Sequence, residues 1–179
     1  PKLHLIDDGF PRACSVGRGP RGATVVVSTG LLTALTPGEL EAVLAHELAH
    51  VRSRDVLTQT YAALLGATLL ELTRVGGFLS RALVAVLAPV ASAFAHLLLS
   101  PKRELAADDT AAELVDPHDL ADALARLDRA ADLVEFRASP ATEPLWTVSP
   151  FDHSERVSAM FVTHPPVADR VARLRAASV

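Results

Sequence analysis

The stretch TPGELEAVLAHELAHVRS, residues 36–53, predicts one helix with a chemically active face. Thr36 can cap the helix, Pro37 suits its first turn, and Glu39 completes a capping box with Thr36. Apolar residues then recur at helical spacing and give the helix a side to bury, namely Leu40, Val43, Leu44, Leu48 and Val51. We therefore expect a helix over residues 37–53 that packs against the rest of the domain.

His46, Glu47 and His50 form an H-E-x-x-H pattern inside this expected helix. Histidines four residues apart lie one turn from each other on the same face, so both imidazoles can reach one metal ion. Glu47 is next to the first histidine, which places it beside the open position of the metal, where a general base for water belongs. The pattern predicts His46 and His50 as zinc ligands and Glu47 as the catalytic base.

A zinc hydrolase normally takes a third protein ligand and leaves the fourth position open. One further turn along, the residue is Val56, so the third ligand must come from another part of the chain. Glu104 is the best candidate, because Asp108 follows four residues later and can orient a ligating imidazole. Taken alone, the charged residues between 102 and 108 would be interpreted as a solvated face. Together with H-E-x-x-H they favour a ligand.

The composition excludes several classes of protein. Half of the 179 residues are apolar, and a net charge of −4 gives no basic surface for nucleic acid. The single cysteine, Cys14, excludes an internal disulfide and a cysteine-based zinc site. Pro1 is not followed by a charged and then apolar leader, so we expect no signal peptide here and interpret the chain as part of a longer protein.

Apolar residues are concentrated over residues 57–99. Two apolar runs, 56–74 and 78–100, are separated by Gly76 and Gly77, which predicts a hydrophobic helical hairpin. The second run is long enough to cross a bilayer, whereas polar residues interrupt the first. Two interpretations remain open: a hairpin that spans the membrane, and a hairpin that packs on the domain or on a partner.

Three short strands are expected, over residues 3–6, 13–17 and 24–28. The segment from Gly17 to Gly22 matches G-x-G-x-x-G, but it contains a proline and leads into a strand, so it predicts a hairpin loop and no dinucleotide site. We expect residues 24–28 to form an edge strand, onto which an extended substrate could add.

The remaining expected elements are helical and complete the fold prediction. Helices are expected over residues 102–115, 117–133 and 166–177, with a loop-like segment at 136–153. The fold class is therefore α+β and mainly helical, with a small antiparallel sheet and an inserted hydrophobic hairpin. Residues 1–179 are expected to form one domain.

The order and spacing of these motifs resemble peptidase family M48, specifically the HtpX-like membrane-bound zinc metalloproteases. The similar segments cover nearly the whole chain: residues 29–32, 37–50, 55, 103–108, 163–166 and 170–174. The resemblance implies a gluzincin-type zincin domain with one zinc ion per chain. It gives the ligand role to His46, His50 and Glu104, the base role to Glu47, and a supporting role to Asp108.

The resemblance also implies what the whole protein does. It implies a zinc metalloendopeptidase that acts in quality control on unfolded or membrane proteins. It places the full-length protein in the cell membrane, with the catalytic domain on the cytoplasmic side and with N-terminal membrane helices outside the present sequence. One segment departs from the family pattern: residues 12–17 read RACSVG where relatives usually carry N-A-F-A-T-G near the substrate cleft.

Two alternatives remain at this point. The first is a non-catalytic, zinc-stabilised scaffold or adaptor at the membrane. The altered segment 12–17 favours this alternative, whereas Glu47 argues against it because a scaffold needs no general base. The second is a metal-independent helical membrane protein, which would require H-E-x-x-H to be accidental.

Several other polar residues have weaker patterns. His164 could donate a hydrogen bond to the tetrahedral intermediate or serve a structural turn, and His153 lies in a proline-flanked loop that could reach the cleft. Asp55 is expected to fix the end of the first helix without touching metal. The histidines without a partner pattern are expected to be structural or exposed, namely His4, His96 and His118.

Overall fold

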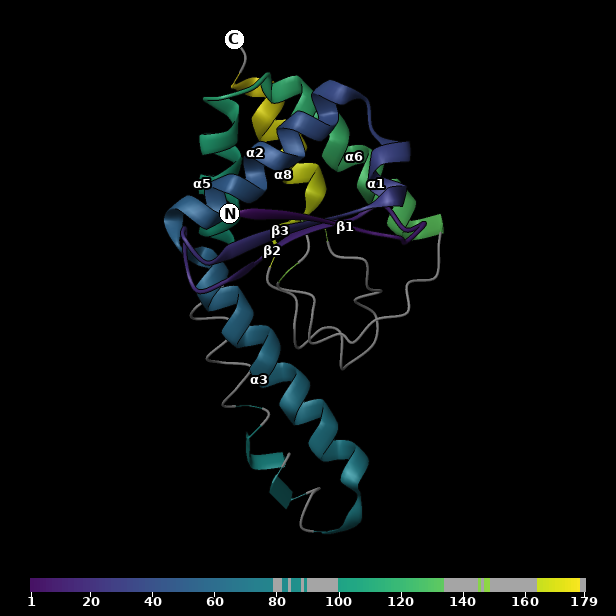
Figure 1. Cartoon of the computed structure of the whole chain (residues 1–179), viewed down its shortest axis with the longest axis vertical. Helices are drawn as coiled ribbons and strands as arrows, with labels where there is room; N and C mark the ends of the chain where they lie inside the picture. The colour runs from purple at the N-terminus through teal and green to yellow at the C-terminus, as the bar shows by residue number, and fades with distance from the viewer. Residues whose placement is uncertain are drawn as a thin grey trace.

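The structure is a computed structural model and is mainly helical, with one small sheet (Figure 1). Five helices, α1, α2, α5, α6 and α8, gather over the sheet, and α3 extends away from them (Figure 1). The α+β fold class is confirmed. The residues that the structure describes are 1–78, 82–83, 85–87, 89, 100–133, 145, 147–148 and 164–177.

The sheet contains β1 (Lys2–Ile6), β2 (Ala13–Gly17) and β3 (Ala23–Ser28) in the order β1-β3-β2. β2 and β3 pair antiparallel, as expected, but β1 pairs parallel to β3, so the sheet is mixed and not antiparallel throughout. β3 lies between the other two strands. The prediction that residues 24–28 form an edge strand is therefore wrong: β3 shares its backbone hydrogen bonds with a strand on each side, and β1 and β2 are the edges.

The glycine-rich segment forms the connection between β2 and β3, which confirms the hairpin loop. Gly17 has φ of 140°, a conformation that L side chains rarely adopt. A Cβ atom there would lie 2.5 Å from the carbonyl oxygen of Gly22. Gly17 therefore allows a close approach of backbone to backbone, which accounts for this glycine without a phosphate ligand.

The helix that carries H-E-x-x-H is α2 (Pro37–Ser53), with the bounds expected from sequence. Its capping box is complete: the Thr36 N–H donates to Glu39 Oε2 at 2.7 Å, and the Glu39 N–H donates to Thr36 Oγ1 at 3.3 Å. The helix ends at Arg54, which adopts the left-handed conformation with φ of 66°. This single residue turns the chain into the next helix.

Two apolar cores hold α2 in place. One lies between the sheet and the helices α2 and α6 (Pro117–Leu133), and the other joins α2 to α5 (Pro101–Ala112), α6 and α8 (Val167–Ala176). Each fully buried leucine contributes roughly 1.5–3 kcal/mol relative to an exposed one. The second core includes Leu120, Leu124 and Leu174, and it brings α5 and α8 beside α2 although they are far from it in sequence.

The long helix α3 (Asp55–Val75) agrees with the first expected apolar run. Its start is buried at Val56, whereas Leu64 and Leu65 further along are exposed. Within the residues that the structure describes, no helix combines the length and the hydropathy needed to cross a bilayer. Most of the second apolar run, 78–100, lies outside the described residues, so the two interpretations of the hairpin both stay predictions.

Candidate functional site

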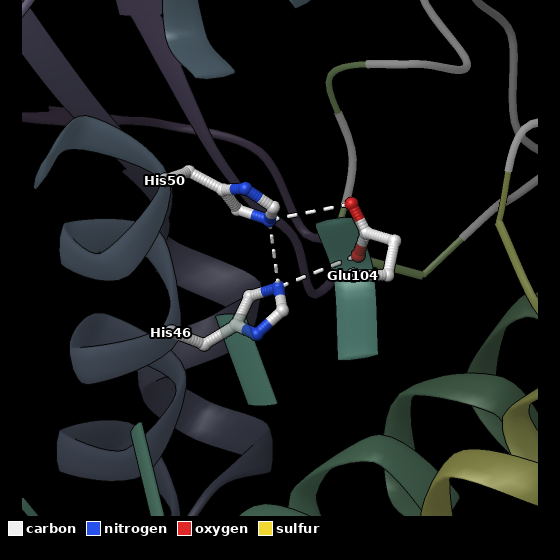
Figure 2. A group of neighbouring side chains, drawn as sticks. All are labelled: His46, His50 and Glu104. Atoms are coloured by element: carbon white, nitrogen blue, oxygen red, sulfur yellow. Dashed lines mark hydrogen bonds and ion pairs between the residues drawn. The ribbon is translucent and has the colours of Figure 1, made fainter. Parts of the chain in front are cut away.

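The three predicted ligands converge between α2 and α5 (Figure 2). His46 and His50 lie on the buried face of α2, with their Nε2 atoms 3.1 Å apart. Glu104, buried near the start of α5, faces them from the other side (Figure 2). Its Oε2 is 3.6 Å from His46 Nε2, and its Oε1 is 3.3 Å from His50 Nε2. The two Nε2 atoms and the Glu104 carboxylate therefore face the same space between the two helices.

These separations fit a small tetrahedral metal ion. Bonds of about 2.0–2.1 Å at a tetrahedral angle place neighbouring ligand atoms roughly 3.3 Å apart. The three separations of 3.1, 3.3 and 3.6 Å bracket that value, with each histidine facing a different oxygen of Glu104. Two imidazole nitrogens and one carboxylate oxygen are also a donor set that zinc accepts, with a fourth position left for water or substrate. His46, His50 and Glu104 therefore fit a zinc ion in both chemistry and spacing.

The electrostatics of the cluster keep Glu104 ionised. Burial alone would raise the pKa of Glu104, but the positive charges of His164 and His50 outweigh burial and hold it well below its usual value. Burial would likewise lower the pKa of His50, yet the Glu104 and Asp55 carboxylates raise it to about 10. A divalent cation competes with that proton, so we expect metal binding to release a proton from His50.

Asp108, the residue predicted to support a ligand, lies directly behind His46. Asp108 Oδ1 lies 3.0 Å from His46 Nδ1, so the other ring nitrogen, Nε2, is left facing Glu104. Burial raises the pKa of Asp108, but two hydrogen bonds from Arg170 lower it to about 2. These bonds join Arg170 Nε to Oδ2 at 2.8 Å and Nη2 to Oδ1 at 2.7 Å. The carboxylate is therefore charged and fixed in orientation.

Asp55 supports His50 in a similar way. Its Oδ2 lies 3.5 Å from His50 Nδ1 and accepts a hydrogen bond from Ser53 Oγ at 2.5 Å. The expectation that Asp55 fixes the helix end is incomplete, because the same carboxylate also faces a ligand ring. The left-handed turn at Arg54 brings Asp55 back over the last turn of α2. The sequence did carry a signal for this contact, because an aspartate lies five residues after the second histidine of H-E-x-x-H.

Glu47 is buried beside the ligands and has a partner that the sequence did not reveal. Thr147 Oγ1 donates to Glu47 Oε1 at 2.7 Å, across a hundred residues of chain. Thr147 is itself buried, and its carbonyl oxygen accepts from Arg170 Nη1 at 2.9 Å. Arg170 belongs to the segment 170–174 that carries part of the resemblance, but sequence analysis gave it no role. A fully buried arginine near two carboxylates has no signature in sequence.

The weaker histidine predictions have different outcomes. His164 lies in the cluster, with Nδ1 3.2 Å from Glu104 Oε2. His153 and His96 lie outside the described residues. His4 and His118 are exposed, as expected.

The segment 12–17, which departs from the family pattern, includes β2 and lies next to Glu47. Ala13 O is 3.3 Å from Thr147 Oγ1, the same hydroxyl that contacts Glu47. Cys14 is buried, and burial, reinforced by the charge of Glu47, raises the pKa of its thiol to about 12. Cys14 is therefore a protonated core residue and no nucleophile at neutral pH.

Comparison with known proteins identifies the family of this chain. Residues 2–178 match the model of peptidase family M48. Three similar proteins are each named "Protease HtpX homolog". The one from Pelotomaculum thermopropionicum is 36% identical over 198 residues, covering 100% of this chain and 70% of the relative. Those from Acidiphilium cryptum and Salinibacter ruber are 38% and 39% identical, covering 98% and 97% of this chain and 67% of each relative. This chain therefore belongs to peptidase family M48.

Proposed function

We propose that this chain is the catalytic domain of a zinc-dependent endopeptidase. The observation that supports the proposal best is the convergence of His46, His50 and Glu104 from two helices, with ligand-atom separations of 3.1–3.6 Å. Membership of a peptidase family supports the reaction class, and the buried Glu47 beside the ligands supplies the base that hydrolysis needs.

The chemistry divides between the bound ion and the side chains of this chain. When bound by His46, His50 and Glu104, zinc supplies a Lewis acid that polarises the scissile carbonyl and makes water easier to deprotonate. Glu47 takes a proton from the attacking water on its carboxylate and later delivers it to the departing amine. Asp108 keeps the His46 ring turned toward the ion.

We extend the proposal to substrates and location. The substrates are unfolded or membrane proteins in a quality-control role, and the full-length protein lies in the cell membrane with this domain on the cytoplasmic side. The resemblance of the motifs supports both statements. The exposed apolar side chains of Tyr61, Leu64, Leu65 and Phe78 support a lipid or membrane-protein neighbour for α3 and the residues after it. Flotation of the full-length protein with lipid vesicles tests the location.

Cleavage of casein by zinc-loaded protein tests the activity. Glu47→Gln should keep one zinc per chain and lose cleavage, because the amide cannot accept the proton. His46→Ala should lose the metal, measured by elemental analysis. His118→Ala removes an exposed histidine and should match wild type in both measurements. A wild-type protein that holds zinc but cleaves nothing would favour the scaffold alternative, and chelator-resistant cleavage would contradict the zinc mechanism.

A further inference from the structure

The carboxylate of Glu47 has one hydrogen-bond partner among the described residues, the hydroxyl of Thr147. The distance from Thr147 Oγ1 to Glu47 Oε1 is 2.7 Å, within the range for a hydroxyl that donates to a charged carboxylate. Both side chains are buried, with exposed fractions of 2% for Glu47 and 3% for Thr147. Water therefore competes little for this bond, and it fixes one of the two carboxylate oxygens.

The Thr147 hydroxyl carries a single hydrogen and has two possible acceptors in the part of the chain that the structure describes. Ala13 O lies 3.3 Å from Oγ1, farther than Glu47 Oε1 at 2.7 Å. The shorter contact and the negative charge both favour donation to Glu47. Among the described residues Oε2 has no such donor, so it is the oxygen available to receive a proton.

Arg170 binds both Thr147 and Asp108, the residue that lies behind His46. Arg170 donates from Nη1 to Thr147 O at 2.9 Å and from Nε and Nη2 to the two oxygens of Asp108 at 2.8 and 2.7 Å. Asp108 in turn lies 3.0 Å from His46 Nδ1. One guanidinium on α8 therefore connects to His46 through Asp108 and to Glu47 through Thr147.

We propose that Thr147 is a positioning residue for the general base, held by Arg170, which sets the orientation of Glu47 relative to the metal ligands. This inference rests on the proposed peptidase function. A general base accelerates a reaction only when its accepting atom lies within hydrogen-bond reach of the proton, and small displacements are costly. A side chain as long as glutamate has many rotamers, so an oriented carboxylate needs such a partner.

The test compares Thr147→Val with Thr147→Ser in zinc-loaded protein, using a quenched fluorogenic peptide at varied concentration. Valine keeps the shape of threonine but lacks the hydroxyl, so kcat should fall roughly 10- to 100-fold while KM stays within about threefold. Serine keeps the hydroxyl and should return kcat to within about threefold of wild type. Thr110→Val is the matched control, because it removes a hydroxyl from α5 that donates within its own helix, in an exposed hydrogen bond to Ala106 O.

Two measurements without activity accompany the kinetics. Zinc content should stay at one ion per chain in Thr147→Val, which shows that the ligands are intact. A crystal structure of this variant should show the Glu47 carboxylate displaced from its wild-type orientation. If Thr147→Val does not fold, Thr147→Ala serves with the same expectations.

The outcomes separate this inference from the proposed function. Unchanged kcat in Thr147→Val, or equal loss in the serine and valine variants, would overturn the positioning role while leaving the peptidase assignment intact. A wild-type protein without activity would end the proposed function. In that case the crystal structure decides: an unmoved Glu47 carboxylate in Thr147→Val overturns the inference, and a displaced one supports the positioning of Glu47 by Thr147.

Discussion

The two candidate histidine ligands have supports of the same chemistry but very different burial. Behind His46 lie Asp108, whose side chain is 1% exposed, and Arg170, which is 0% exposed. Behind His50 lie Asp55, 11% exposed, and Arg103, 38% exposed, with an ion pair of 3.1 Å between them. The buried support has shorter contacts, 3.0 Å to the ring against 3.5 Å. The charge interactions behind His46 are therefore little screened by solvent, whereas those behind His50 are partly screened.

The largest expected effect comes from breaking the buried support. Arg170→Met leaves the charge of Asp108 buried without its partner, which should cost about 3–5 kcal/mol in the free energy of unfolding. Arg103→Met removes the corresponding partner of Asp55 near solvent and should cost only about 0–1 kcal/mol. Urea unfolding of the zinc-loaded variants measures both. Similar costs for the two variants would remove the distinction between the supports.

A second experiment asks whether the same asymmetry extends to metal affinity. Asp108→Asn should weaken zinc binding about 10- to 100-fold, because the His46 ring loses its charged orienting partner. Asp55→Asn should weaken binding less, by under about 10-fold, since its contact with His50 is longer and partly exposed. Competition with a chromophoric chelator gives the affinities. A larger loss for Asp55→Asn would reverse the proposed order.

Glu39 provides an intermediate case, a buried carboxylate paired with a half-exposed arginine. Burial opposes its charge, but hydrogen bonds from Thr36 and Arg126 lower its pKa below the ordinary value of 4.5. A lowered pKa in the folded state stabilises the protein above about pH 4.5 and loses that effect as the pH falls through the folded pKa.

The glutamate is tested with Glu39→Gln, which keeps a capping side chain and removes the charge. We expect a loss of about 0.5–1 kcal/mol at pH 7. The difference from wild type should shrink as the pH is lowered below about 4.5, the ordinary value for this group. Chemical denaturation measured between about pH 3 and 7, a range that covers the titration of the carboxylate, checks this pH dependence. A difference independent of pH would show that the charge of Glu39 contributes nothing.

The smallest effect is expected for an ion pair on the surface. Arg173 and Asp109 are joined at 2.6 Å, but their side chains are 50% and 51% exposed. Arg173→Gln should change the free energy of unfolding by no more than about 0.5 kcal/mol. Thermal unfolding in low and high salt measures it. A loss as large as that of Arg170→Met would mean that position on α8, and not burial, sets the cost.

The sequence predicted best those features that depend on residues close together in the chain. The bounds of α2 and α6 agree with the expected ranges, since a capping box, prolines at the first turn and apolar spacing act within a few residues. The three candidate ligands were predicted because H-E-x-x-H combines with Glu104 and with Asp108 four residues later, and the structure brings His46, His50 and Glu104 together. For this cluster, the residue types and their spacing in the sequence were enough to identify the candidate site.

Sequence failed where the answer depends on distant pairing. The central place of β3 and its parallel partner β1 are set by how the chain crosses the sheet, which no strand encodes by itself. The hydrogen bonds of Thr147 and Arg170 span 100 and 62 residues and carry no periodic signal. The contact between Asp55 and His50 is short in sequence but depends on one left-handed residue.

That residue, Arg54, also has a mechanical consequence. A helix of 21 residues is about 30 Å long, and its first part packs on the domain: Val56 and Ala63 are buried, and Thr60 Oγ1 accepts from the Gly17 N–H at 3.1 Å. Asp55 lies at this packed end, 3.5 Å from the His50 ring. A substitution that shifts the packed start of α3 should therefore also move Asp55 and disturb the less buried half of the candidate metal site.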